Sequence, residues 1–186
     1  MVRPAVVLGS TQPADAVVPG AAGLDVARRR SGGGAVLVEP GRTVWADVVV
    51  PAGDVLWDAD VGRAAWWLGE VWASTLAALG VPGGVVHRGA IVRNALSPTV
   101  CFAGLGPGEV TVGGRKVVGI AQRRNRHGAL FQCAVPLAWD PSTLLAALSL
   151  SAPERESAAA VLAGSVCALD NRSAFDVEAA FLASLP

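Results

Sequence analysis

The chain has 186 residues, enough for one domain whose core needs neither disulfides nor a structural metal. Apolar residues make up 52% of it and charged residues 16%, which excludes a disordered chain. Its fifteen cations balance its fifteen anions, so the net charge gives no reason to expect nucleic acid or an anionic membrane as a partner.

Neither a membrane span nor a secretory signal is expected. No stretch approaches the roughly 18 uninterrupted apolar residues of a spanning helix, and the N-terminus lacks a charged flank before an apolar run. We therefore expect a cytoplasmic protein. Its cysteines, Cys101, Cys133 and Cys167, are odd in number and far apart in sequence, so we expect neither a disulfide framework nor a structural zinc site.

Three β-rich segments are predicted in the N-terminal part of the chain. Residues 4–9 contain a short apolar run, and residues 35–39 and 43–50 are rich in valine. The Pro40-Gly41 pair between the last two segments is typical of a tight turn, so we expect these two segments to pair as a hairpin.

The longest predicted helix covers residues 59–79. Apolar residues recur there at helical spacing, and Gly80 and Pro82 supply a stop. We expect its tryptophans to pack against a sheet rather than to line a ligand tunnel. We expect the nearby carboxylates to cap the helix or face solvent rather than to bind a metal. The tryptophans are Trp66, Trp67 and Trp72, and the carboxylates are Asp54, Asp58 and Asp60.

Four further strands are predicted, over residues 85–92, 109–112, 116–121 and 129–137. The Gly113-Gly114 pair predicts a tight turn between the second and third of them. Between the last two lies a basic stretch that ends at a histidine, over residues 123–127, for which one interpretation is a solvated loop. In the first strand we expect His87 to be a core or edge residue whose ring nitrogens are hydrogen-bonded, rather than a metal ligand.

Three helices complete the chain, over residues 142–150, 154–163 and 174–182. The order of the elements predicts an α+β fold, with a mixed, largely antiparallel sheet and packed helices. We expect residues 1–150 to form the core of the domain and residues 151–186 to be a short helical appendage of the same domain.

One lysine, Lys116, stands among fourteen arginines. Where arginine serves as the general cation, a remaining lysine suggests a role that needs a compact ammonium on a flexible stem. In its segment, Gly114-Arg115-Lys116-Val117-Val118-Gly119-Ile120-Ala121-Gln122, the small Gly119 and Ala121 leave room for a ligand, and the ammonium suits stabilisation of charge on an acyl oxygen. The alternative is chance survival of a lysine on a solvated turn.

A second motif, Arg28-Arg29-Arg30-Ser31-Gly32-Gly33-Gly34-Ala35-Val36, joins three cations to three consecutive glycines. Successive N–H groups of a glycine loop can cradle a phosphate or carboxylate, and the arginines can supply charge. Because the common phosphate-loop and dinucleotide patterns are both missing, the motif alone fits a flexible surface turn as well as a ligand-binding loop.

Together the two motifs resemble the signatures of the biotin/lipoate protein ligase family, specifically lipoate protein ligases and the related octanoyl transferases. The glycine segment resembles R-R-x-[ST]-G-G-G-x-V, and the lysine segment resembles G-[RK]-K-[IV]-x-G-[SI]-A-Q. His127-Gly128-Ala129-Leu130 and Leu8-Gly9-Ser10-Thr11-Gln12 are similar to two shorter family motifs, and the resemblance extends from about Pro4 to Leu150.

The resemblance implies attachment of a lipoyl or octanoyl group to a lysine of a lipoyl carrier domain, in a 2-oxoacid dehydrogenase or a glycine-cleavage protein. In a ligase, ATP with Mg²⁺ and free lipoate or octanoate form an acyl-adenylate, which the acceptor lysine attacks. The resemblance implies that Lys116 polarises the acyl carbonyl or the phosphate. It also implies that the acyl-adenylate lies against Arg29, Arg30, Ser31, Gly32, Gly33, Gly34, Gly119, Ala121 and Gln122.

Cys101 offers a second mechanism, because Val100-Cys101-Phe102 before the lysine segment also resembles a branch of octanoyl transferases with a cysteine nucleophile. There the cysteine takes an acyl group from a thioester on an acyl carrier protein and passes it to the acceptor lysine without ATP. Such a thiolate needs positive surroundings, which Lys116 or the arginines could supply. The other interpretation is a buried, inert cysteine.

The chain departs from the family pattern in two ways. Related enzymes often carry a histidine and an aspartate where this chain has Val38 and Glu39, and we expect the chain to be without the family's usual N-terminal helix and without a large accessory domain. Activity could therefore require a companion subunit. A further alternative is a non-catalytic homologue that binds a lipoyl, biotinyl or acyl group without transferring it.

Overall fold

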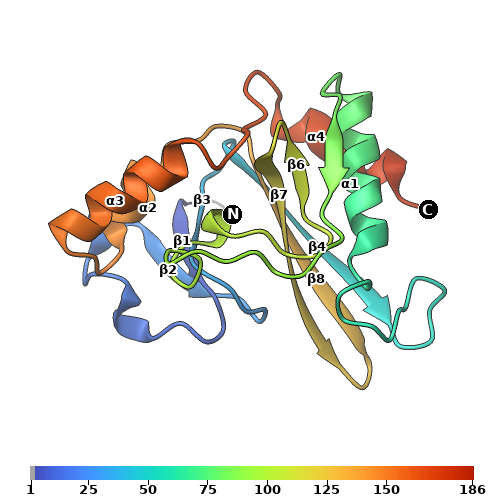
Figure 1. Cartoon of the computed structure of the whole chain (residues 1–186), viewed down its shortest axis with the longest axis horizontal. Helices are drawn as coiled ribbons and strands as arrows, with labels where there is room; N and C mark the ends of the chain where they lie inside the picture. Colours follow the sequence, from blue (N-terminus) through green and yellow to red (C-terminus); the bar gives the residue numbers. More distant parts are fainter. Residues whose placement is uncertain (1–2) are drawn as a thin grey trace.

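The computed structural model describes residues 3–186, which form two β-sheets with helices on their outer sides (Figure 1). One sheet has three strands in the order β2-β1-β3, and the other has five in the order β4-β8-β7-β6-β5. The pair β1–β2 is parallel and the other strand pairs described are antiparallel. The predicted α+β fold, mixed and largely antiparallel, is confirmed.

The three-stranded sheet is built on β1 (Ala5–Leu8), which is buried along its whole length. It pairs with β2 (Asp25–Arg28) on one side and with β3 (Val36–Val38) on the other. Alternate side chains of β1 enter two different cores, as the period of a strand requires. One of these cores includes residues of α2 (Ser142–Ala147) and α3 (Ala152–Ala163), which lie over this sheet in Figure 1.

The five-stranded sheet contains three long strands, β4 (Thr43–Pro51), β7 (Arg115–Asn125) and β8 (Gly128–Pro136), and two short ones, β5 (Gly84–Val86) and β6 (Val110–Val112). The predicted turn between β6 and β7 is confirmed. Its two glycines both have positive φ, 57° at Gly113 and 76° at Gly114, as a two-residue hairpin turn of this kind requires.

Two helices, α1 (Trp66–Ala78) and α4 (Ala174–Ser184), pack together against the five-stranded sheet. Trp72 is fully buried and stacks on Phe181 with ring centroids 4.2 Å apart, and Trp67 meets Phe131 edge to face. Trp66 lies under the guanidinium of Arg88 instead. The expected packing role therefore holds for Trp67 and Trp72, and none of the three tryptophans lines the cavity described below. No helix of residues 3–186 is long and apolar enough to cross a membrane.

The predicted hairpin over residues 35–50 is wrong. The Pro40-Gly41 turn leads from one sheet into the other, so β3 pairs with β1 and β4 pairs with β8. The parallel strand β2, whose four residues are all exposed, was not predicted. Both differences arise because strand pairing depends on partners distant in sequence.

The limits of three other predicted elements also differ. The long helix begins at Trp66 rather than near residue 59, because Asp58 and Asp60 each accept a backbone N–H two residues ahead and hold turns there. The strand predicted over residues 85–92 ends at Val86, after which the His87 ring nitrogen lies 2.7 Å from the Ala90 carbonyl oxygen. The basic stretch after Gln122 continues β7 to Asn125 instead of forming a solvated loop throughout.

Candidate active site

A cavity of about 360 Å³ lies between the glycine loop that follows β2 and one end of strand β7. It brings together residues that are far apart in the sequence. The predicted site residues that line it are Gly32, Gly33, Gly34, Cys101, Lys116, Ala121 and Gln122. Four others do not line it: Arg29, Arg30, Ser31 and Gly119.

Arg29 lies beneath the glycine loop and holds it in place. It is 5% exposed, and its guanidinium donates to the carbonyl oxygens of Gly32 at 2.7 Å and Gly34 at 2.8 Å, and to Ser31 Oγ at 3.1 Å. Burial lowers the pKa of Arg29 from its usual value, while nearby Cys101 and Glu109 oppose that shift. Arg29 is therefore a structural support of the loop, and Arg30 is exposed beside it.

The backbone N–H groups of the three loop glycines are left without partners. In the part of the chain that the structure describes, neither a backbone nor a side-chain oxygen accepts from the N–H groups of Gly32, Gly33 and Gly34. These residues line the cavity, so the loop offers consecutive donors of the kind that bind phosphate or carboxylate.

The glycine loop also packs tightly against the segment that carries Cys101. A Cβ at Gly34 would lie 2.5 Å from the backbone nitrogen of Val100, so only glycine fits there. Ala35 donates to the Thr99 carbonyl at 2.8 Å and accepts from the Cys101 N–H at 3.0 Å. These contacts bring Cys101 to the cavity wall.

A chain of polar side chains ties the glycine loop to the five-stranded sheet. Ser31 Oγ donates to Gln132 Oε1 at 2.9 Å, and the Gln132 amide donates to Asp47 Oδ1 at 3.1 Å. Gln132 and Asp47 lie directly opposite each other on β8 and β4. The sequence prediction missed both, and their only sequence signal is a polar residue within a strand of apolar ones.

Lys116 lies at the start of β7 and is 4% exposed, so the alternative of a solvated turn is wrong for this residue. Its Nζ lies 2.8 Å from Glu109 Oε1 and donates to the carbonyl oxygens of Cys101 at 3.0 Å and Gly104 at 3.1 Å. Gly119 leaves room for the lysine stem, because a Cβ there would lie 3.3 Å from Lys116 Cε. Gly119 thus leaves space for the Lys116 side chain and does not itself line the cavity.

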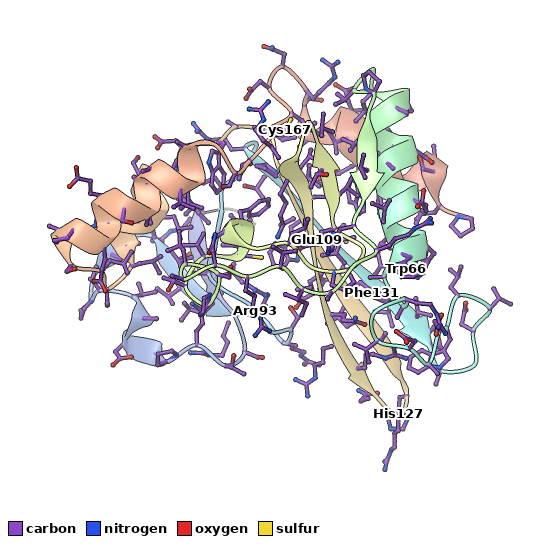
Figure 2. The ribbon with its side chains drawn as sticks, viewed as in Figure 1. Trp66, Arg93, Glu109, His127, Phe131 and Cys167 are labelled. Atoms are coloured by element: carbon purple, nitrogen blue, oxygen red, sulfur yellow. The ribbon has the colours of Figure 1, made fainter. Side chains whose placement is uncertain are left out.

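Glu109, which the sequence prediction missed, is the buried counter-ion of Lys116. Figure 2 shows it near the middle of the molecule, and it lines the cavity. Its carboxylate also accepts from the N–H groups of Ile120 at 3.0 Å and Gly106 at 2.6 Å. A signal was present in the sequence, because Glu109 is the single acidic residue between Glu70 and Asp140.

The cavity residues do not form a magnesium site by themselves. Among the described residues, no three His, Cys, Asp or Glu side chains come close enough to hold a metal ion. Glu109 is the only carboxylate in the cavity lining, and it is already paired with the ammonium of Lys116. Mg²⁺ usually binds through one or two carboxylates together with substrate phosphates, so here the phosphates of a nucleotide would have to supply most of its ligands.

Three further residues singled out from the sequence lie away from the cavity. Val38 is buried in β3, and Glu39 forms an ion pair with Arg42 at 3.4 Å. His127 is exposed at the tip of the β7–β8 hairpin, as Figure 2 shows. The replacements at Val38 and Glu39 therefore remove no group from the cavity lining.

Comparison with known proteins supplies the context for this site. Residues 2–180 match the family model of the lipoyl protein ligase A/B catalytic domain. A comparison with curated protein sequences gives no significant match. A Thermoplasma acidophilum protein assigned as a lipoate protein ligase, solved with bound lipoic acid, is 21% identical with a TM-score of 0.71, over 98% of this chain and 67% of that chain.

Two other solved structures are similar to the same degree. The archaeal bipartite lipoate protein ligase of T. acidophilum, studied with its E2 lipoyl domain, is 20% identical with a TM-score of 0.73 and covers 98% of this chain and 66% of that chain. A lipoate-protein ligase A bound with ATP is 21% identical with a TM-score of 0.71, over 98% and 67%. This chain thus spans about two thirds of the length of these proteins, and likeness at such identity shows the fold alone. Because the family model matches nearly the whole chain, the protein belongs to the lipoyl protein ligase A/B catalytic domain family.

Proposed function

We propose that this protein attaches a lipoyl or octanoyl group to a lysine of a lipoyl carrier domain, by way of an acyl-adenylate made from ATP and the free acid. One observation carries the proposal: the unpartnered N–H groups of the glycine loop and the buried ammonium of Lys116 line the same cavity. Such a cavity suits a ligand with a phosphate beside an acyl carbonyl.

In the proposed reaction, the N–H groups of Gly32, Gly33 and Gly34 hold the phosphate of the acyl-adenylate. Lys116 donates a hydrogen bond to the acyl carbonyl oxygen, on which negative charge develops as the acceptor amine attacks the carbonyl carbon. The amide bond forms, AMP leaves with the electrons of the acyl–phosphate bond, and the amine loses its proton to water. Ala121 and Gln122 line the space for the ligand.

The acceptor is proposed to be the lipoyl domain of a 2-oxoacid dehydrogenase or a glycine-cleavage protein. The likeness to an archaeal ligase studied with its E2 lipoyl domain supports this choice. That ligase is bipartite, and this chain covers 66% of the chain it matches. A companion subunit is therefore part of the proposal and must be tested beside the isolated chain.

A second candidate function is ATP-independent octanoyl transfer with Cys101 as the nucleophile. One observation favours it: Cys101 lines the same cavity as Lys116. The thiolate attacks the thioester of an octanoyl carrier protein and releases the carrier thiol. The acceptor lysine then attacks the new thioester, which returns the thiol of Cys101.

The test is intact-mass analysis of an apo lipoyl domain incubated with this protein. One arm supplies lipoate or octanoate with Mg·ATP, and the other supplies octanoyl carrier protein without ATP. ATP-dependent mass addition that is lost in Lys116→Ala and retained in the exposed neighbour variant Arg115→Ala supports the ligase. ATP-independent addition that is lost in Cys101→Ser and retained in Cys167→Ser supports the cysteine route.

Absence of transfer has a defined meaning as well. If neither arm adds mass, both are repeated with a candidate companion subunit from the same genome. Absence of transfer there too, together with saturable binding of lipoate, biotin or octanoate, would establish the non-catalytic alternative and contradict the proposed activity.

A further inference from the structure

Every hydrogen-bond donor of the Lys116 ammonium is already engaged. An ammonium carries three N–H bonds, and Nζ has three acceptors: Glu109 Oε1 at 2.8 Å, the Cys101 carbonyl at 3.0 Å and the Gly104 carbonyl at 3.1 Å. A ligand oxygen can therefore reach this ammonium only when one of the three acceptors gives way.

Glu109 is the acceptor that is fixed in place. Its side chain is 6% exposed, and backbone N–H groups on both sides, from Gly106 and Ile120, donate to its two oxygens. A charge-assisted bond to a carboxylate is also stronger than a bond to a neutral carbonyl. Loss of this contact would leave two opposite charges buried without a counter-ion.

The two carbonyl acceptors belong to a segment with free space beside it. Gly104 and Leu105 line both the cavity of about 360 Å³ and a second cavity of about 260 Å³, and Lys116 lines both as well. Leu105 is held by paired backbone bonds to Val92, which is itself 56% exposed. This segment has fewer restraints than the Glu109 carboxylate, so the Gly104 carbonyl is the acceptor that can be exchanged.

The charges around the ammonium also require a carboxylate at this position. Arg93 lines both cavities, and Arg29, beneath the glycine loop, is close enough to Glu109 for that carboxylate to raise its pKa against the effect of burial. Cys101 is the remaining titratable group there. Glu109 is the single carboxylate in the lining of either cavity, so it alone balances these cations.

We infer that Glu109 is the positioning residue for Lys116: its carboxylate anchors the ammonium at the cavity wall while a ligand oxygen replaces the carbonyl of Gly104. The ligand part of this inference rests on the proposed function. The anchoring part does not, and it can be tested in the protein without substrate.

A double-mutant cycle tests the anchoring. Lys116→Met and Glu109→Gln each leave a buried polar partner unpaired, so each should lower the melting temperature by about 5 °C or more. The double variant should lose clearly less than the sum of the two. The matched control is the exposed pair of Arg88 and Glu70, 2.6 Å apart, for which Arg88→Met and Glu70→Gln should be additive and small. Additive losses at Lys116 and Glu109 would overturn the inference.

The position of the ammonium can be followed directly, because Lys116 is the only lysine of the chain. An amine-selective acylating reagent should modify wild-type Lys116 slowly and the Glu109→Gln variant about tenfold faster or more, since the side chain loses its anchor. Peptide mass mapping reads the modification, and the N-terminal amine is the internal reference. Equal rates in wild type, Glu109→Gln and the control Glu70→Gln would contradict the assigned role.

An activity measurement then tests the ligand part. If the transfer reaction is observed, Glu109→Gln should lower kcat while KM for the free acid stays within about twofold, because the anchor acts on the reacting carbonyl rather than on acid binding. An unchanged kcat would overturn that part. If no variant and no wild type transfers, the proposed function fails, and the cycle and the labelling still decide whether Glu109 anchors Lys116.

Discussion

At the residue scale, the glycine loop provides two neighbouring positions with opposite tolerance for a side chain. A Cβ at Gly34 would lie 2.5 Å from the Val100 nitrogen and 2.8 Å from the Cys101 nitrogen, and backbone atoms cannot move away cheaply. A Cβ at Gly32 would meet no atom within 4 Å. We therefore expect Gly34→Ala to lower the free energy of unfolding by about 1–3 kcal/mol, through overpacking, and Gly32→Ala to leave it nearly unchanged.

Urea unfolding of the two variants beside wild type checks this prediction. Because Gly34 packs on the segment that carries Cys101, Gly34→Ala should also reduce ligand binding. A loss of binding in Gly32→Ala, which keeps its N–H, would report only the methyl group added beside the ligand. Equal unfolding midpoints for Gly34→Ala and wild type would show that the loop is not held at this contact.

The same scale shows how much of the site the sequence could predict. Lys116 and the glycine loop stood out because each is an unusual residue type in its context, and Glu109 could have been found by the same argument. Asp47 and Gln132 could not, because their contact exists only through the register of β4 against β8. That register depends on the whole sheet and leaves no local pattern.

At the element scale, predictions held where local chemistry decides the structure. The β6–β7 hairpin follows from a Gly-Gly turn, and α3 begins where Ser151 and Glu154 form a capping box. The predicted pairing of β3 with β4 failed because a turn brings two strands near each other without choosing their partners. Local sequence signals therefore predicted this turn and this helix, whereas the pairing of the strands into sheets depends on long-range packing.

The contact between α4 and α1 yields a prediction at this scale. Phe181 on α4 is 5% exposed and stacks on Trp72, whereas Phe175 on the same helix is 77% exposed. We expect Phe181→Ala to cost about 3–5 kcal/mol of unfolding free energy, through lost burial and a cavity, and Phe175→Ala to cost less than about 0.5 kcal/mol. Thermal and urea denaturation of both variants measure the difference. Similar losses in the two would mean that α4 is not held through this stack.

At the scale of the whole molecule, the balance of fifteen cations and fifteen anions limits self-repulsion near neutral pH. Stability against pH should then depend on the few groups whose folded surroundings differ most from water. Cys133 is the clearest of them. It is fully buried in β8, and burial raises the pKa of its thiol from 9.0 to about 12.

The sign of the effect follows from linkage. Below pH 9 the Cys133 thiol is neutral in both the folded and the unfolded chain, so it gives no pH dependence. Between pH 9 and about 12 the unfolded chain ionises the thiol and the folded chain does not, so the free energy of unfolding should fall by as much as about 1.4 kcal/mol per pH unit from this group. Urea unfolding of wild type from pH 7 to 11 should show the decline. Cys133→Ala should show a smaller decline and Cys167→Ala the same decline as wild type, whereas equal slopes in all three would show that the Cys133 thiol is not the source of the alkaline loss.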